Sequence, residues 1–155
     1  MAKAIVVYES KYGNTKLAAE AIINGMRGVP GVETTLAEPK EVSLNQLAAF
    51  NTIVVGSPNH IGGATRNIRK LIGSLGKFDL RGKYAAVFDT YMGSDFEKAV
   101  KKMEKQISEK APQLKLAVPG LSIRVKGMKG PIDEGELPKC KEFGVNIATR
   151  IKDLA

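Results

Sequence analysis

The chain has 155 residues and a mass of 16.7 kDa, which is the size of one ordinary domain. Its composition, 43% hydrophobic and 26% charged, excludes wholesale disorder and a collagen-like repeat. The single cysteine, Cys140, excludes an intramolecular disulfide and a cysteine-rich metal or iron–sulfur site, and the single histidine, His60, excludes a multi-histidine metal centre. The net charge of +8 favours an acidic partner, whether nucleic acid, an anionic membrane, a phosphorylated cofactor or an acidic protein.

No apolar run approaches the ~20 residues that a membrane-spanning helix needs. The first eight residues reach Glu9 too soon to form the apolar part of a signal peptide. We therefore expect a cytoplasmic protein with no membrane partner, and the lone cysteine suits a reducing compartment.

The first half of the chain predicts three strands with helices between them. Residues 4–8 form a short apolar, β-rich run, and apolar residues at helical spacing follow from Leu17 to Gly25. Residues 32–37 predict a second strand, after which Ser43–Gln46 has the form of a capping box that opens a short helix. Residues 52–55 predict a third strand, followed by a glycine-containing loop over 56–63. The next helix presents one apolar face, which Gly76 closes; the face consists of Ile68, Leu71, Ile72 and Leu75.

The second half repeats the alternation twice. Residues 84–88 predict a fourth strand, and Ser94–Glu97 reads as a capping box for a helix whose apolar residues include Phe96. Residues 114–125 predict a fifth strand that is bent or divided at Pro119–Gly120, because proline donates no ladder hydrogen bond. The final helix needs Pro138 in its first turn; its apolar face is Cys140, Phe143, Ile147, Ile151 and Leu154.

Five strand–helix units with short connections predict an α/β fold. Parallel strands need crossover connections, and the crossover helices bury both faces of the sheet. We therefore expect one domain over residues 1–155, a three-layer sandwich with a five-stranded parallel sheet and helices on both faces. Ligands of such sheets bind beyond the carboxyl ends of the strands, which directs attention to the loops after the first, third and fourth strands.

The first of these loops resembles a phosphate cradle. It runs from a strand end into a helix start, where free backbone N–H groups and the helix dipole favour a phosphate. At a generic turn of this kind Asn14 and Thr15 would simply cap the helix, but Ser10 and Tyr12 add hydroxyls beyond what one cap uses. Neither a triphosphate-binding nor a dinucleotide-binding glycine motif is present. The candidate phosphate ligands are Ser10, Lys11, Tyr12, Gly13, Asn14 and Thr15.

The other two loops offer flat rings, polar donors and glycines that let a ligand approach the backbone. A planar ligand with a phosphate tail would fit between them. The second loop contributes Ser57, Pro58, Asn59, His60, Ile61, Gly62 and Gly63. The third contributes Thr90, Tyr91, Met92 and Gly93.

Taken together, these loops resemble those of the flavodoxin family, in particular its short-chain archaeal and anaerobe branch and the flavin domain of flavodiiron proteins. The family's phosphate loop is usually [ST]-x-[ST]-G-N-T, and residues 10–15 match it except at Tyr12. The strand and loop at 53–59 are similar to the family's second flavin loop, and 121–143 to its last strand and helix. The resemblance covers essentially the full chain.

The resemblance implies a sheet of strand order 2-1-3-4-5 and non-covalently bound FMN. It implies that residues 10–15 bind the phosphate and that the loops at 57–63 and 90–94 flank the isoalloxazine. The function it implies is electron transfer between redox partner proteins, with no catalytic amino acid and no metal. Cys140 is expected to pack in the core.

Two features depart from the family pattern. Many flavodoxins stack the flavin between tryptophan and tyrosine, but this chain has no tryptophan, so we expect His60 or Ile61 on one face and Tyr91 on the other. Many long-chain members are acidic, whereas this chain is basic, which should raise the flavin potential. We expect Arg66, Arg69 and Lys70 to dock an acidic redox partner. The lysines of the fourth helix, Lys98, Lys101, Lys102 and Lys105, read as a solvated helix face.

Two rival functions remain open at this point. An FMN-dependent NAD(P)H or quinone oxidoreductase can use the same fold, but it usually needs an insertion for its second substrate, which favours a small electron carrier here. A nucleic-acid-binding module would need a recognisable motif besides the positive charge, and none is present, so we expect no nucleic-acid partner. We favour a monomer, although the sequence leaves the oligomeric state undetermined.

Overall fold

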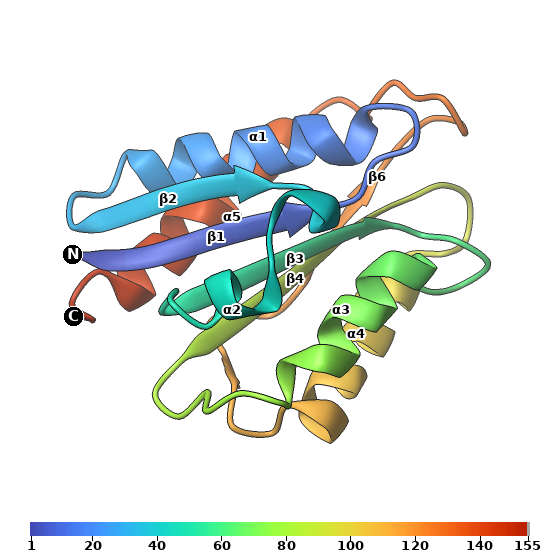
Figure 1. Cartoon of the computed structure of the whole chain (residues 1–155). Helices are drawn as coiled ribbons and strands as arrows, with labels where there is room; N and C mark the ends of the chain where they lie inside the picture. The colour runs from blue at the N-terminus through green and yellow to red at the C-terminus, as the bar shows by residue number, and fades with distance from the viewer. Residues whose placement is uncertain (155) are drawn as a thin grey trace.

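The computed structural model describes residues 1–154, and Ala155, the last residue of the expected domain, lies outside the described residues. Strands and helices alternate along the chain as expected (Figure 1). The strands are β1 Ala2–Tyr8, β2 Val32–Ala37, β3 Thr52–Pro58, β4 Tyr84–Tyr91, β5 Lys115–Leu116 and β6 Leu121–Arg124. The helices are α1 Asn14–Arg27, the 3₁₀ turn η1 Pro39–Glu41, α2 Leu44–Leu47, α3 Arg66–Leu75, α4 Lys98–Lys110 and α5 Glu136–Ile151.

The sheet has the strand order β2-β1-β3-β4-β5, and every pairing between these strands is parallel. β6 pairs with β4 beyond β5, so the expected fifth strand is divided into two pieces along one edge of β4. The expected break at Pro119–Gly120 lies between these two pieces. This confirms the predicted three-layer α/β sandwich and its strand order.

Apolar residues bury both faces of the sheet. One core packs α3 and α4 against side chains such as Ile5, Ile53 and Val87. The other packs α1 and α5 against side chains such as Val54 and Phe88. Figure 1 shows α3 and α4 together on the side of the sheet opposite α1. Since successive residues of a strand point to opposite faces, the nearly unbroken apolar strands supply both cores.

Close backbone approach joins α1 to α5. A Cβ added at Gly25 would lie 2.0 Å from the Lys141 carbonyl oxygen, and one at Gly144 would lie 2.0 Å from the Ile22 carbonyl oxygen. Both glycines therefore allow the two helices to touch backbone to backbone. Cys140 is fully buried in the same layer, as expected, and burial raises the pKa of its thiol to about 12.

Several local predictions are confirmed. Ser43 accepts a hydrogen bond from the Gln46 N–H at the start of α2, and the Gln46 side chain returns one to the Ser43 N–H. Pro138 lies in the first turn of α5, and Gly76 ends α3.

The predicted start of α4 is wrong. Ser94–Glu97 forms no capping box, since α4 begins at Lys98 and Glu97 precedes it in a left-handed conformation with φ 62°. Phe96 is exposed rather than part of the apolar helix face. The helix is capped instead from the neighbouring strand, because the buried Asp89 carboxylate accepts the Val100 N–H at 2.9 Å. A carboxylate at this position also interacts favourably with the positive end of the helix dipole.

Two of the expected loops begin later than predicted. β3 continues to Pro58 and β4 continues to Tyr91, so residues 56–58 and 89–91 are strand rather than loop. Their pairing extends to Pro58 opposite Thr90.

Within residues 1–154, no helix is both long and apolar enough to cross a bilayer.

Candidate functional site

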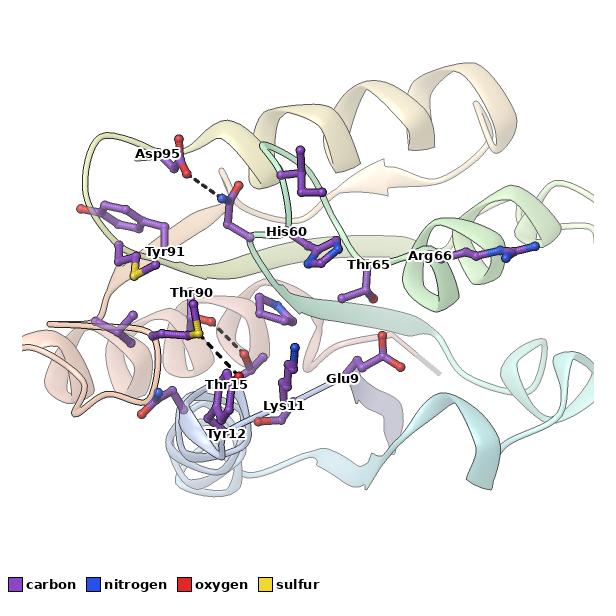
Figure 2. A pocket seen from close by; sticks show the side chains of 18 of the residues that line it. Glu9, Lys11, Tyr12, Thr15, His60, Thr65, Arg66, Thr90, Tyr91 and Asp95 are labelled. Atoms are coloured by element: carbon purple, nitrogen blue, oxygen red, sulfur yellow. Dashed lines mark hydrogen bonds between the residues drawn. The ribbon is translucent and has the colours of Figure 1, made fainter.

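A cavity of about 730 Å³ lies at the carboxyl ends of β1, β3 and β4, where each strand passes into its connection. It is open on one side and bordered by four connections (Figure 2). The lining residues are Glu9, Ser10, Lys11, Tyr12, Asn14, Thr15, Pro58, Asn59, His60, Ile61, Thr65, Arg66, Arg69, Thr90, Tyr91, Met92, Asp95, Val125 and Met128.

The connection after β1 is organised by Ser10 rather than by the Asn14–Thr15 cap that a generic turn of this kind would have. Gly13 precedes α1 with φ 94°, a conformation that favours glycine, and it has no side chain with which to cap the helix. The Ser10 hydroxyl oxygen accepts the Gly13 N–H at 3.1 Å and the Lys16 N–H at 3.3 Å. The N–H groups of Asn14 and Thr15 have no acceptor in the part of the chain that the structure describes.

These free amides make the first turn of α1 a suitable anion cradle. They stand at the positive end of the helix dipole, and no acidic side chain occupies that turn. Lys11 extends over the Tyr12 ring, with its Nζ 5.5 Å from the ring centroid. Backbone donors, positive charge and the absence of a carboxylate from this helical turn fit a phosphate group.

At the floor of the cavity, hydroxyl groups join the start of α1 to the end of β4. Thr15 and Thr90 are buried, and their hydroxyl oxygens lie 2.8 Å apart in a hydrogen bond. This bond fixes the start of α1 against the end of β4. The dashed line between these residues in Figure 2 marks it.

The connection after β3 makes a tight two-residue turn. The His60 N–H donates to the Gly63 carbonyl at 2.7 Å, and the Gly63 N–H donates back to the His60 carbonyl at 3.2 Å. Both central residues have positive φ, 51° for Ile61 and 75° for Gly62. A β-branched residue rarely adopts this conformation, so Ile61 is strained, and the residue is 91% exposed beside the cavity.

The end of β4 and the connection after it contribute an aromatic pair and a carboxylate. Tyr91 is buried, with its ring centroid 5.5 Å from that of Phe96 in an edge-to-face arrangement. Asp95 accepts a hydrogen bond from the Asn59 side-chain amide at 2.8 Å and forms an ion pair with Lys98 at 2.9 Å. Asp95 therefore ties the second connection to the third and to α4.

Beneath this connection, burial and, to a smaller extent, the Glu97 carboxylate raise the pKa of Asp89, whose net value is about 6. Hydrogen bonds from the Ser122 hydroxyl and from the Val100 and Ile123 N–H groups act in the opposite direction and lower the pKa. Ser122 also accepts the Glu97 N–H at 2.9 Å. Asp89 thus anchors the return of the third connection into α4 without lining the cavity.

A fourth wall comes from the segment after β6, which the sequence did not suggest. Val125 and Met128 line the cavity, and the Tyr12 hydroxyl donates to the Met128 sulfur at 3.5 Å. The rule that ligands bind at the carboxyl ends of parallel strands could have found this wall, because β6 ends at the same edge of the sheet.

The structure brings most of the predicted site residues to one cavity. Glu9, Thr65 and Asp95 also line it, although sequence reasoning gave them no role, and so do Arg66 and Arg69, which were expected to dock a partner. The predicted residues that line the cavity are Ser10, Lys11, Tyr12, Asn14, Thr15, Pro58, Asn59, His60, Ile61, Thr90, Tyr91 and Met92. Those that do not are Gly13, Ser57, Gly62, Gly63 and Gly93.

Three of these five residues stabilise the connection after β3 without lining the cavity. The Ser57 hydroxyl is buried and accepts the Thr65 N–H at 2.9 Å, and Gly62 and Gly63 belong to the turn after β3.

In the part of the chain that the structure describes, no group of three or more histidine, cysteine or carboxylate side chains could hold a metal ion.

Comparison with known proteins places the chain in a family. The Flavodoxin domain family matches residues 5–124. A Type A flavoprotein, fprA, of Rhodobacter capsulatus is 28% identical over 151 residues, which are 95% of this chain and 33% of that protein. A flavodoxin of Aquifex aeolicus is 31% identical over 98 residues, 60% of this chain and 52% of that protein.

Among solved structures, a flavodoxin from the domain Archaea superposes with a TM-score of 0.82 at 31% identity, covering 97% of this chain and 99% of that one. The chain thus matches that structure over nearly its whole length. This chain covers only about a third of the Rhodobacter protein and about half of the Aquifex protein.

Proposed function

Because the chain belongs to the flavodoxin family, we propose that it carries electrons between redox partner proteins through one bound FMN. FMN is the cofactor of the family. The observation that carries the proposal is the cavity itself, in which an anion cradle with free amides stands beside two connections bearing flat side chains.

The residues of the cradle would hold the FMN phosphate. The N–H groups at the start of α1 would donate to the phosphate oxygens, and Ser10 would keep the loop in shape through its two hydrogen bonds. The ring would lie between the second and third connections, with His60 or Ile61 on one face and Tyr91 on the other. When bound, FMN supplies the redox chemistry, so the protein needs no catalytic residue of its own.

Position and charge support a docking role for the start of α3. Arg66, Arg69 and Lys70 are exposed, and none of them pairs with a carboxylate in the described chain. Figure 2 shows Arg66 extending away from the loops of the cavity. We assign these three residues to an acidic redox partner in the cytoplasm, which their field would steer toward the cavity mouth.

A turnover assay distinguishes this carrier from a reductase. FMN-loaded protein is mixed with NADPH and a quinone, with no partner reductase added, and NADPH oxidation is compared with that caused by the same concentration of free FMN. An electron carrier gives no more oxidation than free FMN. Sustained turnover well above that level would overturn the proposal in favour of an NAD(P)H or quinone oxidoreductase.

A further inference from the structure

Lys102 of α4 lies against the outer side of the His60–Gly63 turn. Its Nζ is 3.7 Å from where a Cβ would stand on Gly62, and its Cδ is 3.5 Å from the corresponding position on Gly63. These distances are those of ordinary van der Waals contact, so the lysine side chain lies directly beside the turn. The opposite side of the same turn lines the cavity through His60 and Ile61.

Lys102 also differs from two of its neighbours in charge balance. Lys98 pairs with Asp95 at 2.9 Å, and Lys105 lies 3.9 Å from Glu109. No carboxylate of the described chain pairs with Lys102. Lys102 is exposed, as expected for a solvated helix face, and its ammonium group places an uncompensated positive charge beside the turn.

We propose that Lys102 sets the electrostatic potential at the His60–Gly63 turn and thereby raises the midpoint potential of the flavin. This inference rests on the proposed function, since it requires FMN in the cavity. A nearby positive charge favours whichever redox form carries more negative charge. Lys102 would thus act on the flavin electrostatically, through the turn, without contacting a reacting atom.

The balance of the reaction gives the sign of the effect. Near neutral pH, oxidised FMN takes up two electrons and one proton, so the flavin ring gains one negative charge. In a reductive titration dithionite donates the electrons and is oxidised to sulfite, and water supplies the proton. Removing the Lys102 charge therefore weakens binding of reduced FMN more than binding of oxidised FMN, and the midpoint potential falls.

The test compares the midpoint potentials of FMN-loaded variants at one ionic strength. Lys102→Gln is expected to lower the ratio of reduced to oxidised FMN affinity about tenfold, which equals about 30 mV for a two-electron couple. Lys102→Arg keeps the charge and should retain the original potential. Lys101→Gln is the matched control, because it removes the same charge from the adjacent exposed position of α4.

Each outcome has a definite meaning. A shift with Lys102→Gln that Lys102→Arg restores, together with a clearly smaller shift in Lys101→Gln, supports the inference. Equal shifts in Lys102→Gln and Lys101→Gln, or no shift in either, overturn it and leave the proposed function intact. If the unsubstituted protein binds no FMN, the proposed function fails first, and the titration shows this before any potential is measured.

Discussion

At the scale of single residues, Ile61 combines backbone strain with exposure. Its φ of 51° is unfavourable for a β-branched side chain, whereas asparagine tolerates this region well. We predict that Ile61→Asn raises the free energy of unfolding of the FMN-free protein by about 1 kcal/mol, measured by urea denaturation.

The same substitution should weaken FMN binding several-fold, because an amide replaces an apolar side chain that lines the cavity. Fluorescence titration of FMN measures this loss. Opposite effects on stability and affinity are expected when strain serves a binding site. A variant that is less stable than the unsubstituted protein would show that the turn is not strained.

Asp89 gives the protein a pH-dependent stability. Its pKa in the folded protein, about 6, lies above its ordinary value of 3.8, so between these values the folded state binds more protons than the unfolded state. The contribution of Asp89 to the free energy of unfolding is therefore fully present below pH 4 and is lost as the pH rises through 6. The total change is at most about 3 kcal/mol.

Comparison with Asp89→Asn isolates this contribution. We predict that the difference in unfolding free energy between the variant and the original protein changes between pH 4 and pH 6.5 in favour of the variant. Urea denaturation at a series of pH values measures it. A difference that stays constant over this range would contradict the raised pKa.

At the scale of elements, the contact between α1 and α5 depends on Gly25 and Gly144. Alanine at position 25 would place its Cβ within 2.0 Å of a carbonyl oxygen of α5, so the helices must move apart. We predict that Gly25→Ala lowers the free energy of unfolding by about 2 to 4 kcal/mol. Thermal or urea denaturation followed by circular dichroism is the measurement.

A glycine elsewhere in the fold provides the matched control. Gly73 lies inside α3, where an added Cβ would meet only the Gln106 side chain at an ordinary 3.6 Å. Gly73→Ala should therefore stabilise the protein by about 0.5 to 1 kcal/mol through helix propensity. Equal destabilisation by both substitutions would rule out a special role for the α1–α5 contact.

The elements themselves could be predicted from sequence because their periodicity reflects burial. The apolar runs at β1 and β3 and the helical spacing in α3 and α5 each correspond to a buried face. The start of α4 could not be predicted, because its cap comes from Asp89 on the preceding strand rather than from its own first turn. A local motif such as Ser94–Glu97 carries no information about a partner of that kind.

The position of the candidate site could be predicted from the sequence, but some of its contacts could not. The connections after β1, β3 and β4 follow from strand order, since parallel strands end at the same edge of the sheet. The roles of Met128 and Lys102 depend on contacts between segments distant in sequence. No spacing rule within one segment reveals such contacts.

At the scale of the whole molecule, the net charge of +8 should control association with a redox partner. We predict that the association rate with an acidic partner falls as salt is raised from 0.05 to 0.5 M, about tenfold or more. Stopped-flow electron transfer from the reduced protein measures this rate.

Charge reversal at α3 tests where the partner docks. Arg66→Glu with Arg69→Glu should slow association at low salt much more than charge reversal at Lys115 and Lys152, which are exposed positions outside the cavity lining. Equal slowing by both pairs would mean that the net charge acts without a docking site at α3.

Binding of FMN depends most on the anion cradle at the start of α1. Titration of the FMN-free protein with FMN and with riboflavin, which lacks the phosphate, tests this cradle directly. We predict one FMN bound per chain and riboflavin bound at least about 100-fold more weakly, since several charge-assisted N–H donors would lose their acceptor. Failure to take up FMN, or equal affinity for the two flavins, would contradict phosphate binding at this cradle.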